Sequence, residues 1–241
     1  MRIETKQIVL DGISVDVVQK AIKNIHLSVY PPSGRVRISA PLRMGMDAIR
    51  MFAVSKLSWI KKHQSKFRDQ AREAPRECIT GESHYCLGRP YVLLVVEHNA
   101  SPRVVIRNET MEMSVRPDTG IKKRREILDE WYRRELSGII PEMIGRYEKI
   151  MDVKVSGFGI KKMRTRWGTC NRAAKRIWLN LELAKKPKEY IEYIVVHEMT
   201  HLLERRHNKR FYAFMDQFLA EWRFFKEELN RMPLRHEDRT C

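Results

Sequence analysis

Two histidines four residues apart, with a glutamate beside the first, are the residues best suited to chemistry: His197, Glu198 and His201 in the run His-Glu-Met-Thr-His. On an α-helix, residues four apart lie on one face, so the two imidazoles can bind a single metal ion. Glu198 projects about 100° round the helix, where its carboxylate can take a proton from a water at the metal. The pattern predicts a metal-dependent hydrolytic site with Glu198 as general base.

His207 is the expected third ligand. A catalytic zinc site uses three protein ligands and leaves the fourth position open. His207 follows His201 at the interval of the metzincin motif HExxHxxxxxH, in which the chain turns at a glycine before the last histidine. Glu204 stands at that glycine position here, so the turn must be made differently. We expect one Zn²⁺ per chain, and imidazole ligands also accept other divalent transition metals.

The elements that position this site follow from the hydrophobic pattern. The motif continues an apolar stretch at helical spacing, which predicts a helix over 187–205. Residues 175–183 alternate apolar and polar side chains, as is typical of a half-buried strand. A second helix is expected over 209–230. The helical pattern over 127–147 contains Pro141, which predicts two consecutive helices rather than one.

The first part of the chain has a different pattern. Short β-branched segments within residues 1–40 predict strands. Amphipathic spacing over 46–72 predicts one helix, with a break within it left open, and further strands follow. A Pro-Asp-Thr-Gly turn at 117–120 then separates this part from the helical one. We therefore expect an α+β protein: a small β-rich module with one amphipathic helix over 1–118, and a mostly helical domain with a short sheet over 119–241. The sequence shows no internal repeat.

Charge and composition limit the partners. The chain has 47 Lys and Arg against 30 Asp and Glu, a net charge of +17, which suits anions such as nucleic acid or phosphate-rich substrates. Basic clusters at 161–166, 185–188 and 205–210 flank the motif and can attract anions to it. No run of 18 uncharged apolar residues exists, so we expect no membrane span. The N-terminus lacks a signal-peptide pattern, and the scattered cysteines predict reduced thiols in a cytoplasmic protein.

Three blocks of the sequence resemble a known family. They are Arg-Thr-Arg-Trp-Gly-Thr-Cys at 164–170, Ile-Trp-Leu-Asn at 177–180, and the run 193–202 around His-Glu-Met-Thr-His with His207 after it. Their order and spacing are similar to the RWGSC, I-x-LN and VVHELAHL blocks of the YgjP-like metal-dependent hydrolases, which are grouped with SprT-like and gluzincin-type zincins. Residues 57–62 and 88–91 also resemble the N-terminal part of that family.

The resemblance implies an N-terminal β-rich module followed by a zincin-like domain with hydrolase activity. It also implies that His197, His201 and His207 are metal ligands and that Glu198 is the base. Differences from the family pattern, such as Thr169 in place of serine, remove none of these residues. The resemblance does not determine the substrate, because nucleotide pyrophosphatase activity is also ascribed to relatives.

Three further residues are candidates for contacts with a substrate or a transition state. Arg164 and Arg166 precede the strand expected beside the site, where a guanidinium can stabilise developing negative charge. Asn180 is expected at the edge of that strand, where an extended peptide can add by β-augmentation.

The sequence leaves three functions open. The first is a metallopeptidase, and the second is a metal-dependent nucleoside triphosphate pyrophosphohydrolase acting for example on UTP, because the same activated water can attack phosphorus. The third is a nucleic-acid-associated binding protein with a structural metal, which the positive charge favours although no nucleic-acid-binding motif is present. Structural zinc usually has four protein ligands, whereas the sequence offers three. We therefore expect an open, catalytic site with a peptide or nucleotide substrate.

Overall fold

A computed structural model describes residues 5–30, 33–69, 77–163 and 165–231 of the chain. It divides into two compact units, Met1–Arg72 and Glu73–Cys241. Both units combine helices with sheets, so the predicted α+β class is confirmed. None of the helices in the described ranges is long and apolar enough to span a bilayer.

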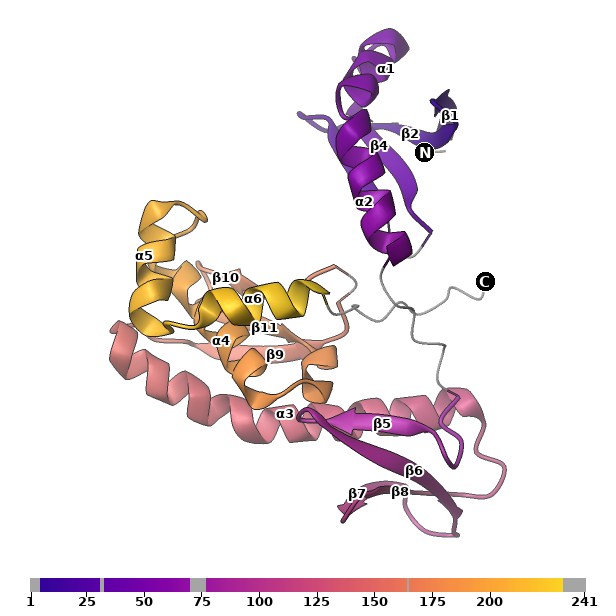
Figure 1. Cartoon of the computed structure of the whole chain (residues 1–241), viewed down its shortest axis with the longest axis vertical. Helices are drawn as coiled ribbons and strands as arrows, with labels where there is room; N and C mark the ends of the chain where they lie inside the picture. The colour runs from indigo at the N-terminus through magenta and orange to yellow at the C-terminus, as the bar shows by residue number, and fades with distance from the viewer. Residues whose placement is uncertain (1–4, 31–32, 70–76, 164, 232–241) are drawn as a thin grey trace. The chain divides into compact units, whose positions relative to one another are not determined.

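The first unit is a four-stranded sheet with two helices (Figure 1). Its elements are β1 (Thr5–Leu10), β2 (Ile13–Lys20), β3 (His26–Tyr30), β4 (Arg35–Pro41), α1 (Met46–Ser55) and α2 (Leu57–Asp69). The helix expected over 46–72 is broken into two, because α1 is capped at Lys56, whose N–H donates back to the carbonyl of Ala53. The sheet and helices enclose a core in which Ile38, Ile49 and Ile60 are fully buried.

The second unit contains two sheets and the helices that carry the histidines. Its elements are β5 (Ser83–Cys86), β6 (Arg89–Glu97), β7 (Arg103–Arg107), β8 (Thr110–Val115), α3 (Ile121–Met151), β9 (Gly157–Lys161), β10 (Gly168–Asn171), β11 (Arg176–Asn180), the 3₁₀ helix η1 (Leu181–Lys185), α4 (Lys188–Leu203), α5 (Lys209–Phe218) and α6 (Trp222–Arg231). The smaller sheet has the order β10-β11-β9, with β10 antiparallel and β9 parallel to β11.

The two four-stranded sheets share one topology. Their orders are β1-β2-β4-β3 and β5-β6-β8-β7, and in each the inner pair is parallel while both outer pairs are antiparallel. The first hairpin of each turns at two residues with positive φ, Asp11-Gly12 and Leu87-Gly88, as a type I′ turn requires. The chain therefore contains a structural repeat, although its sequence shows none.

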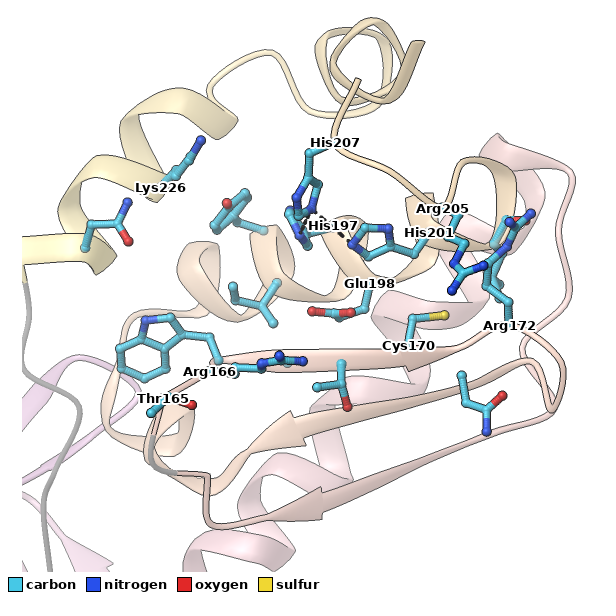
Figure 2. A pocket seen from close by; sticks show the side chains of 18 of the residues that line it. Thr165, Arg166, Cys170, Arg172, His197, Glu198, His201, Arg205, His207 and Lys226 are labelled. Carbon is cyan, nitrogen blue, oxygen red and sulfur yellow. Dashed lines mark hydrogen bonds between the residues drawn. The ribbon is translucent and has the colours of Figure 1, made fainter. Parts of the chain in front are cut away.

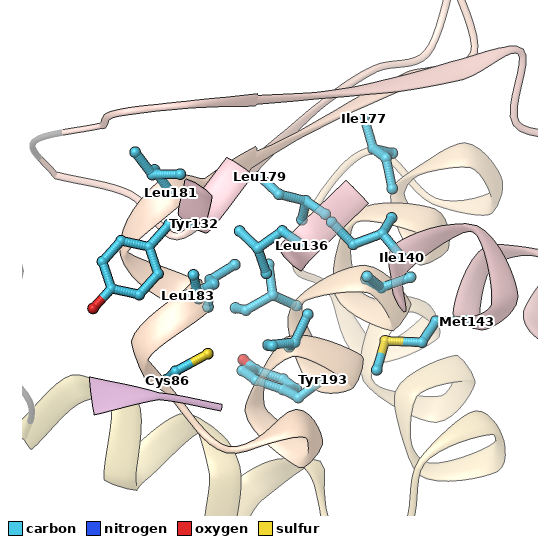
Figure 3. Close-up of a cluster of buried hydrophobic side chains, with 14 of the residues drawn as sticks. Cys86, Tyr132, Leu136, Ile140, Met143, Ile177, Leu179, Leu181, Leu183 and Tyr193 are labelled. Carbon is cyan, nitrogen blue, oxygen red and sulfur yellow. The ribbon is translucent and has the colours of Figure 1, made fainter. Parts of the chain in front are cut away.

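The sheet β5–β8 belongs to the same compact unit as the histidine helices, so the division falls before β5 rather than at the expected 118–119. Helix α3 runs past both sheets of this unit (Figure 1), and the Tyr132 hydroxyl donates to the carbonyl of Tyr85, at 2.7 Å. The Leu87 N–H donates to the carbonyl of Ala184, at 2.8 Å. Figure 3 shows side chains of β5, α3, β11, η1 and α4 in this one core. These contacts between residues distant in sequence place the boundary.

Helix α3 is continuous, which corrects the expectation of two helices. Pro141 lies inside it and removes one backbone hydrogen bond, at a cost of about 3 kcal/mol. Leu136, Ile140 and Ile144, on either side of the proline, are buried in the core. Burying each of these side chains stabilises the fold by roughly 1.5–3 kcal/mol, which outweighs that cost.

Two other elements end earlier than their patterns predicted. The strand expected over 175–183 ends at Asn180, whose side chain accepts a hydrogen bond from the N–H of Glu182 and so begins η1. The helix expected over 209–230 is interrupted after Phe218, and the indole of Trp222 donates back to Asp216, at 2.7 Å. In both places a side-chain hydrogen bond stabilises the change of direction.

Candidate metal centre

Three imidazoles converge at the edge of α4. His197 and His201 lie on one face of that helix, and His207 reaches them from the segment before α5 (Figure 2). The Nε2 atom of His207 lies 3.1 Å from Nε2 of His197 and 3.1 Å from Nε2 of His201. The structure thus brings together the three residues that the sequence predicted as ligands.

The chemistry of these nitrogens fits a divalent transition metal. His201 donates from Nδ1 to the carbonyl oxygen of Glu204, at 3.1 Å, so its Nε2 presents a lone pair. Burial, with the neighbouring His201, His207 and Lys226, lowers the pKa of His197 to about 3, and burial also lowers the pKa values of His201 and His207. When all three rings are neutral, a hydrogen on Nε2 of His207 can be donated to only one of the other two nitrogens, whereas a cation can bind all three. Zn–N bonds of 2.0–2.1 Å place tetrahedral ligands about 3.3 Å apart, close to the observed separation.

The set of ligands is open. Within the described ranges, the group that could hold an ion at this point consists of His197, His201 and His207, without a fourth Cys, His, Asp or Glu. Three protein ligands are typical of catalytic zinc and four of structural zinc. The arrangement therefore favours a site at which water and substrate can bind.

The turn that brings His207 to the site needs no glycine. Glu204 ends α4 in an extended conformation, with φ −134° and ψ 122°, which any residue adopts. Its carboxylate accepts from the N–H of Arg206, at 3.1 Å, and Asn208 caps α5 by accepting from the N–H of Phe211, at 3.0 Å. The ring of Phe211 is fully buried beneath the histidines, with its centroid 4.6 Å from that of His207.

Glu198 lies between the histidines and β10 (Figure 2). Its side chain is buried, which raises its pKa to about 8, while the charge of Arg166 acts to lower it. A Cβ atom on Gly168 would lie 2.6 Å from Oε1 of Glu198 and 2.7 Å from its Cγ. Only glycine therefore allows β10 to approach the carboxylate this closely.

We expect Gly168→Ala to lower turnover about 100-fold while metal binding is retained. The added methyl group must displace either Glu198 or the strand, and a shift of about 1 Å at a reacting group costs about that factor. Steady-state kinetics, with metal content measured on the same preparation, check this. Gly145→Ala is the matched control, because a Cβ there meets nothing within 4 Å. Full activity of Gly168→Ala would show that the close approach is unimportant.

The other three predicted site residues have different outcomes. Arg164 lies outside the described residues. Arg166 is exposed and lines the cleft beside Glu198. Asn180 is fully buried and does not line the cleft, so the expected contact with a substrate is wrong. Its amide instead donates to the carbonyls of Met163 and Arg166, at 2.9 and 2.8 Å, and stabilises the segment before β10.

The site opens into a cleft of about 1260 Å³, whose walls include β10 and parts of α4 and α6. Sequence reasoning did not assign Arg172, Arg205, Lys226 or Tyr193 to it, although all four line it. Arg205 was visible within a basic cluster beside the motif. Tyr193 lies one helical turn before His197 on α4, so helical spacing was a signal for it. No local pattern marks Arg172 and Lys226, because a turn and a distant helix bring them to the cleft.

A second group of potential ligands serves the fold. Cys78, Glu82 and His84 lie close together, but the Glu82 carboxylate accepts hydrogen bonds from the N–H groups of Glu77 and Cys78 and lies 3.2 Å from Nε2 of His84. Burial alone would raise the pKa of Glu82, and these hydrogen bonds together lower it. The carboxylate thus stabilises the turn that precedes β5.

A family model described as YgjP-like, metallopeptidase domain, matches residues 23–232. The chain is similar to the crystal structure of the metallopeptidase zymogen of Pyrococcus abyssi abylysin, with 16% identity, coverage of 38% of this chain and 91% of that chain, and a TM-score of 0.35. It is also similar to the crystal structure of the metallopeptidase zymogen of Methanocaldococcus jannaschii jannalysin. The identity is 18%, the match covers 37% of this chain and 92% of that chain, and the TM-score is 0.34. Both scores are too low to support a conclusion about this chain.

The search of curated proteins found no match. The family model, by contrast, spans most of the chain, including the first unit from residue 23 and all three histidines. The resemblance seen in the sequence blocks is therefore confirmed. The protein belongs to the YgjP-like metallopeptidase domain family and is a metal-dependent hydrolase of the metallopeptidase type.

Proposed function

We propose that the protein is a zinc metallopeptidase in which His197, His201 and His207 hold Zn²⁺ and Glu198 is the general base. The observation that carries this proposal is the position of the Glu198 carboxylate, between three converging imidazoles and a strand that lines an open cleft. The cytoplasmic location expected from the sequence belongs to the same proposal, and the thiols of Cys86 and Cys170, which form no disulfide among the described residues, agree with it.

Each residue has a defined part in the reaction. Zn²⁺ held by His197, His201 and His207 would act as a Lewis acid, which would lower the pKa of a water and polarise the substrate carbonyl. Glu198 takes the proton of the attacking water on its carboxylate and delivers it to the leaving amine. Arg166, exposed beside Glu198, can stabilise negative charge that develops on the carbonyl oxygen.

The strand β10 favours a peptide as the substrate. It is the outer strand of its sheet, and Gly168, Thr169, Cys170 and Asn171 all line the cleft. An outer strand has backbone N–H and C=O groups on one side that can pair with an extended peptide chain. A peptide held in this way lies along the strand with its backbone next to Glu198.

A substrate screen tests the proposal against its main alternative. Zinc-loaded protein is incubated with casein and, separately, with a panel of nucleoside triphosphates that includes UTP. We expect casein fragments, seen by mass spectrometry, whose formation stops when zinc is removed with a chelator. Release of pyrophosphate or phosphate without any casein fragment would identify a pyrophosphohydrolase instead.

A further inference from the structure

Four cationic side chains surround the metal centre. Arg166, Arg172, Arg205 and Lys226 are all exposed and all line the cleft, whereas Glu198 is the one acidic residue among the described residues that line it. The residues that line the cleft therefore carry an excess of positive charge. It belongs to the walls against which a substrate must lie.

None of the four cations makes an ion pair with a carboxylate in the described part of the chain. Arg172 donates to the carbonyl oxygen of Leu202, at 3.1 Å, and Lys226 lies over the rings of Tyr212 and Trp222. These contacts orient the side chains and leave their charge uncompensated. Elsewhere in the same unit, exposed cations such as Arg223 do pair with carboxylates. The cleft therefore presents charge that a ligand can neutralise.

The cations lie on two opposite sides of the catalytic glutamate. Figure 2 shows Arg172 and Arg205 on the His201 side of Glu198, and Arg166 and Lys226 on the other side. Along the chain, Arg166 precedes β10 and Arg172 follows it, and Gly168 within the strand touches Glu198. At about 3.3 Å per residue, a strand from Arg166 to Arg172 spans at most about 20 Å.

We infer that the cleft selects extended peptides with acidic side chains on both sides of the cleaved bond. This inference rests on the proposed peptidase function and names its substrate class. A peptide lying along β10 places its scissile bond at Glu198. On each side of that bond, the side chains within about three residues then lie beside one of the two pairs of cations. Aspartate or glutamate at those positions neutralises the walls, and lysine or arginine is repelled by them.

The separation of the cations favours this ligand over other anions. A nucleoside triphosphate concentrates its charge at one end and can contact one cationic group at a time. A nucleic acid can span both groups, but its sugar–phosphate backbone cannot form the strand-to-strand hydrogen bonds that β10 offers. An acidic peptide uses both the charges and the strand edge.

Matched peptides test this inference. Internally quenched peptides of one length carry Glu, Gln or Lys at the positions within three residues of the cleaved bond. Each exposed ion pair is worth up to about fivefold in affinity. At low salt we therefore expect the wild type to have a kcat/KM about tenfold higher for the Glu peptide than for the Gln peptide. The Lys peptide should have the lowest kcat/KM. High salt should reduce this preference because it screens exposed charges.

Variants link the preference to the cleft. Arg205→Gln should lower the Glu-to-Gln ratio of kcat/KM by up to about fivefold, and Arg172→Gln with Arg205→Gln should lower it further. Arg205 makes no side-chain hydrogen bond within the described residues, so its single variant should fold, which thermal unfolding checks. Lys122→Gln, with the same change of charge on an exposed residue of α3 away from the cleft, should leave the ratio unchanged.

The outcomes separate this inference from the proposed function. Equal cleavage of the Glu and Gln peptides, or a preference for Lys, overturns the acidic preference and leaves the peptidase intact. Cleavage of no peptide, together with intact casein, overturns both. Salt-sensitive binding of a single-stranded oligonucleotide that is lost in the same variants, while the Glu-to-Gln ratio stays unchanged, also overturns the inference and identifies a nucleic-acid ligand.

Discussion

Replacing Glu198 with glutamine is expected to lower kcat for peptide cleavage about 10²- to 10⁴-fold without loss of metal. Glutamine has the shape of glutamate, so it fills the space between the histidines and Gly168, but its amide cannot accept the proton of the attacking water. Glu198 stands outside the group of potential ligands, so zinc stays bound. The expected change corresponds to about 3–5 kcal/mol of transition-state stabilisation.

The experiment compares kcat and bound zinc in the same preparations. Glu189→Gln is the matched control, because Glu189 is an exposed residue on the same helix, in its first turn, and we expect wild-type turnover from it. Loss of zinc together with turnover would show that Glu198 supports the metal rather than the proton transfer. Wild-type turnover in Glu198→Gln would remove it from the mechanism.

The convergence of the three histidines could be predicted from the sequence because it depends mainly on local spacing. His197, Glu198 and His201 occupy one helix, and helical periodicity alone sets which faces they share. His207 required one further assumption, a turn without glycine, which the extended conformation of Glu204 provides. The α+β class likewise followed from patterns of a few residues.

Contacts between distant residues could not be predicted. The closeness of Gly168 to Glu198 and the burial of Asn180 depend on how β10, β11 and α4 pack. Residue types and their periodicity along the chain do not determine that packing. The same reason explains the boundary expected at 118–119, since the bond from Leu87 to Ala184 joins segments far apart in the chain. The shared topology of the two four-stranded sheets is visible only in strand order and direction.

Two predictions about helix breaks were wrong: a break was expected within α3, which is continuous, and none was expected between α5 and α6. Pro141 is a strong local signal for a break, yet the buried side chains around it keep α3 continuous. Residues 219–221 contain no proline or glycine, yet the chain leaves the helix there, where Trp222 bonds to Asp216. Tertiary packing and side-chain hydrogen bonds decided each case over intrinsic propensity.

The second large effect is expected from His201→Ala. This change removes one of three converging nitrogens and also the hydrogen bond from its Nδ1 to the carbonyl of Glu204. Losing a group that merely orients a ligand weakens metal binding about 10- to 100-fold, so losing the ligand itself should cost more than 100-fold, and peptide cleavage should cease with it. His98→Ala, in an exposed loop, is the control.

Zinc content of the purified, reloaded protein, measured by mass spectrometry beside His201→Ala and His98→Ala, tests the central claim most directly. The account predicts about one zinc per chain in the wild type and in His98→Ala, and far less in His201→Ala. A wild type that takes up no stoichiometric metal, or a His201→Ala variant that binds as much zinc as the wild type, would contradict it.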